Sequence, residues 1–271
     1  MASNFPYLAV FSAPRSGSNH FFDLLAARKG LVNLNEFFGQ FGSGPSKEVR
    51  AASLAPFGNW ESFAAVAREH PIETLRFLED MPGAQMAAIK IQPRHLGIPH
   101  PVTEFVEASQ GNIFLRRNPL AVWISRRTVK ESRSWGKVNT ERFHVPFDPQ
   151  AFCSFTFFSL SRLKSIEEIS DSLNRPKWRL SYREVESFGG PQEMWDSLTN
   201  AFPHIPVEAM DPDAREKFVR QDSRRPFDRL SNPDEARRWL TAHGLDSLID
   251  NSDDFDASDI MSIVKPLRSS S

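Results

Sequence analysis

Short apolar segments of strand type alternate with amphipathic segments of helix type along this chain of 271 residues. The strand-type segments are Tyr7–Ser12, Ala87–Gln92, Ile113–Leu115 and Arg179–Ser181; the helix-type segments are Ser18–Lys29, one that begins near Pro119, and one around Gln192–Ala201. Strands separated by helices favour βαβ units. The pattern therefore predicts an α/β fold of three layers, in which a mostly parallel central sheet is flanked by helices.

The chain shows no stretch with the composition of a linker between domains, so we expect one domain over residues 1–271. Within it, residues 211–271 are expected to form a mainly helical C-terminal appendage. Two segments rich in Pro and Gly, Phe38–Gly58 and Trp135–Pro149, are longer than most connections in compact domains. Their length predicts loops with a function, such as lids or substrate-binding loops.

Charge is balanced overall but not locally. The chain has 33 basic and 34 acidic side chains, and the net charge of −1 argues against a protein that binds nucleic acid over its whole surface. The segment Asn112–Lys137, however, carries seven basic side chains and only one acidic side chain, Glu131. This segment includes a predicted strand–helix junction, which favours a site for one small, multiply charged anion.

The sequence also bears on the compartment. Its single cysteine, Cys153, cannot form an internal disulfide, which favours a reducing environment. The first residues lack the basic region of a signal peptide, and no stretch reaches the roughly 18 apolar residues that a membrane-spanning helix needs. We therefore expect a cytoplasmic protein without a transmembrane segment.

The first motif is the segment LAVFSAPRSGSNHFFDLLA, which runs from a predicted strand through a loop with one glycine into a predicted helix. Successive N–H groups of Ser16, Gly17, Ser18, Asn19 and His20 converge at the positive end of that helix, which suits an anion. Arg15 adds a permanent positive charge. The alternative is a serine-rich helix cap without a ligand. The loop lacks the Gly-Lys-Ser/Thr of a Walker A motif.

The second motif is the segment GNIFLRRNPLAVWISRR. Arg117 is expected at the mouth of the sheet, and Ser125 two turns into the following helix, which begins near Pro119. A guanidinium and a hydroxyl at the carboxyl ends of the strands could hold a second anion. The alternative is that Arg116 and Arg117 only make surface ion pairs.

Together, PRSGS at residues 14–18 and the RNxxxxxxS pattern at residues 117–125 resemble the 5′-phosphosulfate loop and the 3′-phosphate motif of sulfotransferases that use 3′-phosphoadenosine 5′-phosphosulfate (PAPS). LSYREV resembles the strand end that the family writes Tyr-Glu-Asp-Leu, which would place Tyr182 near the adenine. NEFF at Asn35–Phe38 resembles the acidic position of bacterial carbohydrate sulfotransferases that act on trehalose or nodulation factors. Arg229–Gly244 is similar to C-terminal stretches of that group. The resemblance covers roughly residues 7–245.

This resemblance implies a P-loop NTPase-like sulfotransferase fold and an enzyme that moves a sulfuryl group from PAPS to a hydroxyl of a carbohydrate or other hydroxylated acceptor. The reaction is an in-line attack that leaves 3′,5′-adenosine bisphosphate and needs no metal. The residues that would bind PAPS are Arg15, Ser16, Gly17, Ser18, Asn19, His20, Arg117, Ser125 and Tyr182. Those that would act in catalysis are Glu36 as the general base, with Arg15 and Lys90 stabilising the leaving phosphate.

The sequence departs from the family pattern in two places. Asn19 and His20 stand where Thr and an apolar residue are more common. Gln92 stands where the KTH segment of cytosolic sulfotransferases has its histidine base. Glutamine cannot take a proton, so the base must come from elsewhere, and Glu36 is the candidate.

Two other functions are open to this sequence. A P-loop kinase or NTPase would bind ATP with magnesium, but the Walker lysine is absent and the strand Ile113–Leu115 is followed by Arg116 instead of an aspartate. A catalytically silent nucleotide-binding protein would keep both phosphate motifs. The expected partner is a small-molecule or glycan acceptor and not a nucleic acid. The oligomeric state, a homodimer included, is left open.

Overall fold

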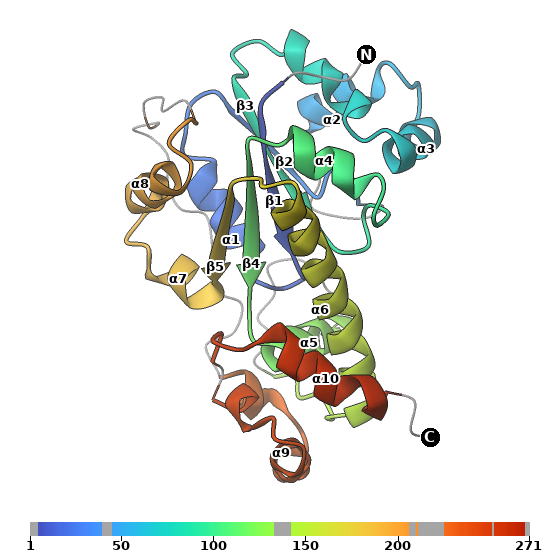
Figure 1. The fold of residues 1–271 in the computed structure, drawn as a ribbon, viewed down its shortest axis with the longest axis vertical. Helices are drawn as coiled ribbons and strands as arrows, with labels where there is room; N and C mark the ends of the chain where they lie inside the picture. Colours follow the sequence, from blue (N-terminus) through green and yellow to red (C-terminus); the bar gives the residue numbers. More distant parts are fainter. Residues whose placement is uncertain are drawn as a thin grey trace.

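The computed structural model describes residues 5–39, 45–132, 142–205, 210, 225–250 and 252–268. Five strands form one sheet in the order β2-β3-β1-β4-β5, and each neighbouring pair is parallel (Figure 1). The strands are β1 (Tyr7–Ser12), β2 (Leu31–Asn35), β3 (Met86–Ile91), β4 (Gly111–Arg116) and β5 (Lys177–Ser181). This sheet, flanked by helices, confirms the predicted α/β architecture of three layers.

The central strands are buried on both faces. Every residue of β1 and of β3 is buried, as expected for parallel strands that helices cover on two sides. Along β1, Ala9 and Phe11 belong to the apolar core on one face, and Leu8 and Val10 to the core on the other. The sheet therefore separates two cores, and its strand ends are left for other tasks.

Different helices cover the two faces of the sheet. One face carries α1 (Ser18–Leu25), α7 (Tyr182–Ser187) and α8 (Pro191–Ala201), and α1 contacts each of the other two. The other face carries α2 (Lys47–Leu54), α3 (Trp60–Glu69), η1 (Glu73–Asp80), α4 (Val102–Ala108) and the upper part of α6 (Pro149–Ser172). Figure 1 shows α1 and α8 to the left of the sheet and α4 and α6 to its right.

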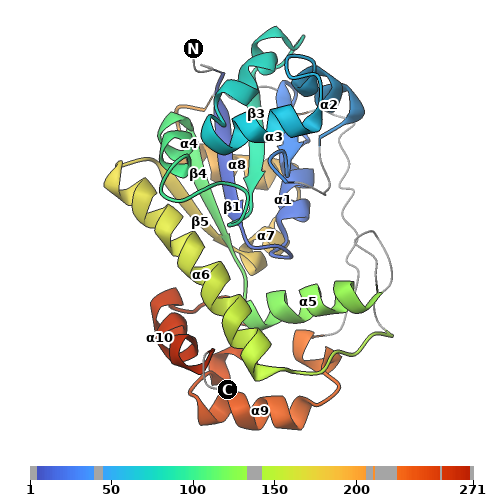
Figure 2. The same ribbon diagram turned by 90° about the vertical axis from the view of Figure 1, so that its right-hand side faces the viewer.

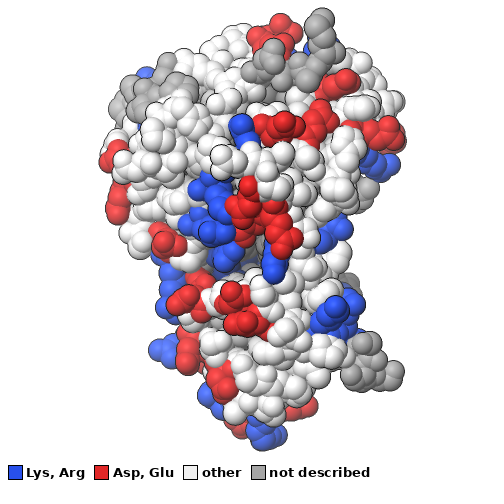
Figure 3. Space-filling view, in the orientation of Figure 1, with Lys and Arg blue, Asp and Glu red and all other residues white. Residues whose placement is uncertain are grey.

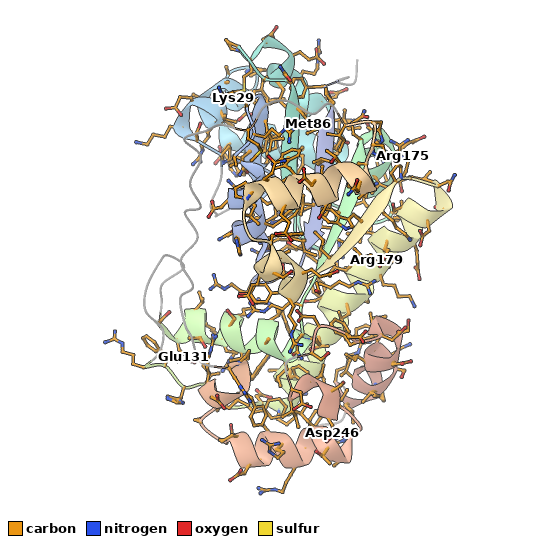
Figure 4. All side chains as sticks on the ribbon, turned by 90° about the vertical axis from the view of Figure 1, so that its left-hand side faces the viewer. Lys29, Met86, Glu131, Arg175, Arg179 and Asp246 are labelled. Carbon is orange, nitrogen blue, oxygen red and sulfur yellow. The ribbon has the colours of Figure 1, made fainter. Side chains whose placement is uncertain are left out.

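A third core lies beyond the carboxyl ends of the strands. It is built by α5 (Pro119–Ser132), the N-terminal part of α6, η2 (Pro226–Arg229), α9 (Pro233–Ala242), η3 (Asp246–Leu248) and α10 (Ala257–Leu267). Figure 2 shows α5, α9 and α10 below the sheet, with α6 running between the two parts. In Figure 4, Asp246 marks this lower layer and Met86 the sheet. The described C-terminal residues therefore share a core with α5 and α6.

Some expectations need correction. Phe38–Gly58 was predicted as a long loop, but it contains α2, whose N-terminus is capped where the Ser46 side chain accepts from the Val49 N–H. The helix predicted over Ser18–Lys29 ends at Leu25.

Of the Trp135–Pro149 segment, residues 135–141 lie outside the described residues, and Val145 forms a bridge with Leu230. Within the described part of the chain, no helix has the length and apolar character that crossing a membrane requires.

Candidate functional site

The loop between β1 and α1 has an unusual backbone. Arg15 has φ of 70° and Gly17 has φ of 87°, both in the left-handed region. A Cβ built on Gly17 would lie 2.2 Å from Cδ2 of Tyr182, so only glycine leaves room for that ring. The loop is therefore curled over the N-terminus of α1, with the Tyr182 ring packed against its glycine.

This loop has the properties of an anion site. The N-cap, Gly17, provides no side-chain cap, and α1 has no acidic residue in its first turn. Ser16, Ser18 and His20 are buried, and the Ser16 hydroxyl has no hydrogen-bond partner within the described residues. Uncapped N–H groups at the positive end of a helix favour a negative ligand, to which a buried serine hydroxyl can also donate.

The two sequence motifs meet at this loop. Arg15 Nε donates to Ser125 Oγ at 3.2 Å, and Arg117 Nη1 donates to the Arg15 carbonyl at 2.8 Å. The Arg117 guanidinium also lies over the Tyr182 ring, 3.9 Å from its centroid. The pKa of Arg15 is lowered from its usual value, mainly by burial and to a smaller extent by the charge of Arg117. An anion bound beside Arg15 and Arg117 would offset the repulsion between their charges.

The neighbouring Arg116 behaves differently. Its Nη2 lies 2.7 Å from Glu167 Oε2, and Arg179 pairs with the other oxygen of the same carboxylate. The alternative of a surface ion pair thus holds for Arg116, whereas Arg117 contacts the loop. Figure 4 shows Arg175 and Arg179 along the β5 side of the sheet. Figure 3, in the orientation of Figure 1, shows basic and acidic side chains side by side in the middle of the molecular surface.

A second cluster lies at the ends of β2 and β3. Lys90 Nζ lies 3.1 Å from Glu36 Oε1 and donates to Asn19 Oδ1 at 2.7 Å. The Lys90 side chain is 1% exposed and that of Glu36 is 15% exposed. Burial lowers the pKa of Lys90, and the charge of Glu36 acts against that shift. Three predicted site residues from three separate segments are thereby joined, and Asn19 has a contact that explains an amide at this position.

His95 is a residue to which the sequence assigned no role. Its Nδ1 accepts from the Gln92 N–H at 3.1 Å, and its Nε2 is buried with no partner within the described residues. A Cβ on Gly39, three residues after Glu36, would lie 3.2 Å from that Nε2. Burial lowers the pKa of His95 to about 4, so the ring is neutral at pH 7. In the sequence, the one feature that distinguishes His95 is its position just after the predicted strand Ala87–Gln92.

A cavity of about 130 Å³ opens beside the loop, next to Ala13 and Arg117. Aromatic side chains supply much of its lining: Phe11, Phe114, Phe155 and Phe255. Arg116, Lys164 and Glu167 add polar groups. No group of three or more His, Cys, Asp or Glu side chains that could hold a metal ion is found in the residues the structure describes.

Comparisons with known proteins give a likeness among solved structures. No protein-family model matches the sequence, and no curated protein matches it significantly. Among solved structures, the sulfotransferase domain from the Synechococcus PCC 7002 olefin synthase matches with a TM-score of 0.45 and 13% sequence identity. The match covers 98% of this chain and 96% of that chain. The function is therefore inferred from the geometry of the site.

Proposed function

We propose that this protein is a sulfotransferase that transfers a sulfuryl group from PAPS to a hydroxyl of a carbohydrate or another hydroxylated acceptor. The observation that carries the proposal is the contact between the two anion-binding elements through Arg15, Ser125 and Arg117. PAPS has phosphate groups on both its 5′ and 3′ positions. Two adjacent cationic elements suit such a ligand better than a single polyphosphate chain.

Different residues of the site would bind different parts of the donor, PAPS. The N–H groups of residues 17–20, the Ser16 hydroxyl and Arg15 would hold the 5′-phosphosulfate, whereas the Ser16 N–H donates to the Ala13 carbonyl. Arg117 and Ser125 would hold the 3′-phosphate, and Tyr182, stacked on Arg117, would lie next to the nucleoside. PAPS supplies the activated sulfuryl group and leaves as 3′,5′-adenosine bisphosphate. Holding both ends of the nucleotide would fix the direction from which the acceptor oxygen attacks.

The cluster around Lys90 provides groups for proton transfer and charge stabilisation. Glu36 would accept the proton of the acceptor hydroxyl while the oxygen of that hydroxyl forms the new bond to sulfur. The Lys90 ammonium holds one carboxylate oxygen and Asn19 at the same time, which keeps Glu36 beside the loop. Arg15 and Lys90 would stabilise the negative charge that develops on the phosphate when its bond to sulfur breaks.

The two other functions fit the site less well. A kinase or NTPase needs a carboxylate for magnesium, but β1, β3 and β4 end in Ser12, Ile91 and Arg116. A silent nucleotide-binding protein would need the phosphate elements but not a Glu36 carboxylate paired with the buried Lys90 beside them. That pair favours an enzyme.

Thermal unfolding with a panel of nucleotides, followed by a transfer assay, tests the proposal. A ligand at 100 times its Kd stabilises a protein by about 2.7 kcal/mol, which is easily measured. We expect stabilisation by 3′,5′-adenosine bisphosphate and PAPS, and much less by AMP or ATP with magnesium. Sulfate transfer from PAPS to a panel of sugars, alcohols and phenols should follow.

Stabilisation by ATP with magnesium and not by the 3′-phosphorylated nucleotides would contradict the proposal. Binding of PAPS without transfer to any acceptor would favour the silent nucleotide-binding protein.

A further inference from the structure

A buried carboxylate from the C-terminal part of the chain joins the two elements that would hold the nucleoside and the 3′-phosphate. Asp253 Oδ1 accepts from the backbone N–H of Asn118 at 2.7 Å, and Oδ2 accepts from the backbone N–H of Arg183 at 3.0 Å. Asn118 directly follows Arg117, and Arg183 directly follows Tyr182. One carboxylate therefore anchors the backbone next to both members of the Arg117–Tyr182 stack.

The segment that carries Asp253 is itself fastened to the same turn. Asn118 is fully buried, and its Nδ2 donates to the carbonyls of Leu248 and Ser252, both at 3.0 Å. Its Oδ1 accepts from the Ala121 N–H at the start of α5. The turn between β4 and α5 is thus bound by Leu248, Ser252 and Asp253, which reach it from the helical layer below the sheet.

Asp253 is an unfavourable residue to bury for stability alone. Burial raises the pKa of Asp253, and the hydrogen bonds from Asn118 and Arg183 act in the opposite direction. Arg117 and Arg183 also favour its charged form. A buried charged group is weak evidence for stability, because its desolvation offsets much of what its partners contribute. Its contacts with two turns of one site indicate a role in the geometry of that site.

We propose that Asp253 is a positioning residue for nucleotide binding, which sets the separation of Arg117 from Tyr182 and thereby the preference for a 3′-phosphate. The inference rests on the proposed function, because it assigns the 3′-phosphate to Arg117. Asp253 itself touches neither the donor nor the acceptor. It acts through the backbone of Asn118 and Arg183.

Replacement of Asp253 by Asn tests the role with almost no change of shape. The amide has one oxygen, so one of the two N–H groups loses its acceptor and faces an NH₂ group instead. We expect the Kd for 3′,5′-adenosine bisphosphate to rise about tenfold, the order expected for one charge-assisted hydrogen bond, and the Kd for AMP to stay within about twofold. Isothermal titration calorimetry with both nucleotides gives the ratio.

The neighbouring Asp254 provides a matched control. It is exposed, and Asp254→Asn makes the same chemical change one residue further along the chain. We expect this variant to keep the wild-type ratio of the two Kd values. The inference would be overturned if Asp253→Asn weakened the binding of both nucleotides equally. It would also be overturned if Asp254→Asn changed the ratio of the two Kd values as much as Asp253→Asn does.

Hydrogen exchange of the wild-type protein gives a second readout that does not depend on a variant folding. 3′,5′-Adenosine bisphosphate should slow exchange in peptides that contain Asn118, Arg183 and residues 248–253 more than AMP does. An equal effect of the two nucleotides would overturn the inference. If the wild-type protein binds no 3′-phosphorylated nucleotide, the proposed function fails as well, whereas binding with an unchanged preference in Asp253→Asn overturns only the role of Asp253.

Discussion

The two halves of the sheet's carboxyl edge carry different kinds of charge. At β2 and β3, the ammonium of Lys90 is matched by the carboxylate of Glu36 and the amide of Asn19. At β1 and β4, Arg15 donates to a hydroxyl, and Arg117 donates to a carbonyl and stacks on an aromatic ring. The first half contains a carboxylate in contact with a buried ammonium, and the second has two arginines without a carboxylate in these contacts. The comparison separates a half suited to proton transfer from a half suited to holding phosphate.

The largest effect is expected for Glu36→Gln, which removes the proposed base but keeps the shape of the side chain. General base catalysis contributes roughly 10²- to 10⁴-fold, so kcat should fall by that order. The Kd for 3′,5′-adenosine bisphosphate should change by less than about twofold, because no phosphate contact is lost. Steady-state kinetics and calorimetry measure the two quantities.

Glu69→Gln, at the exposed end of α3, is the matched control and should leave kcat unchanged. Full activity of Glu36→Gln would show that the base lies elsewhere. Weakened nucleotide binding with unchanged kcat would remove the division between the two halves.

Arg117→Ala tests the other half. Loss of a guanidinium that holds a phosphate should weaken binding of 3′,5′-adenosine bisphosphate by about 10- to 100-fold and that of AMP much less. Arg116→Ala is the control, because Arg116 pairs with Glu167 and should not affect the preference for the 3′-phosphate. Equal losses for both nucleotides in Arg117→Ala would mean that Arg117 does not contact the 3′-phosphate.

The smallest effect concerns His95, beside Glu36. Its pKa is about 4 in the folded protein against 6.5 for an unperturbed histidine, mainly because of burial, with Arg94 and Lys90 lowering it and Glu36 raising it. Between these values the unfolded chain binds a proton that the folded protein does not. The free energy of unfolding should therefore fall as the pH decreases from 6.5 towards 4.

Urea unfolding at pH 7 and pH 5 measures this contribution. In His95→Gln the loss of stability between the two pH values should be smaller than in the wild type by about 2 kcal/mol. The exposed His70 provides the control, and His70→Gln should lose as much stability as the wild type. Identical losses in all three proteins would show that His95 does not stay neutral in the folded protein.

Much of the fold could be predicted from local sequence. The apolar run Tyr7–Ser12 predicts β1 with its observed bounds, and the runs for β3, β4 and β5 overlap the observed strands. The strand β2 was missed because its sequence, LVNLN, contains two asparagines and no long apolar run. It lies at the edge of the sheet, where four of its five residues are only partly buried. The other edge strand, β5, was predicted over Arg179–Ser181, so an edge position alone does not hide a strand from sequence.

The site could be predicted only as separate pieces. Local patterns identify the loop around Gly17 and the Arg117–Ser125 motif, because each lies within one strand–turn–helix unit. The contact of Lys90 with both Glu36 and Asn19 depends on the order in which β2, β3 and β1 pair. Asp253 lies 135 residues from Asn118 in the sequence, and its segment has no motif that would connect the two. His95 becomes notable only through the burial of its Nε2.

The packing of the Tyr182 ring on Gly17 has a consequence for how the two positions can vary. A side chain at position 17 would collide with that ring and would also need a left-handed backbone. Random mutagenesis at position 17 alone should therefore recover almost only glycine. A library that varies positions 17 and 182 together should recover larger residues at 17, such as asparagine, paired with residues smaller than tyrosine at 182, so that these distant positions evolve as one unit.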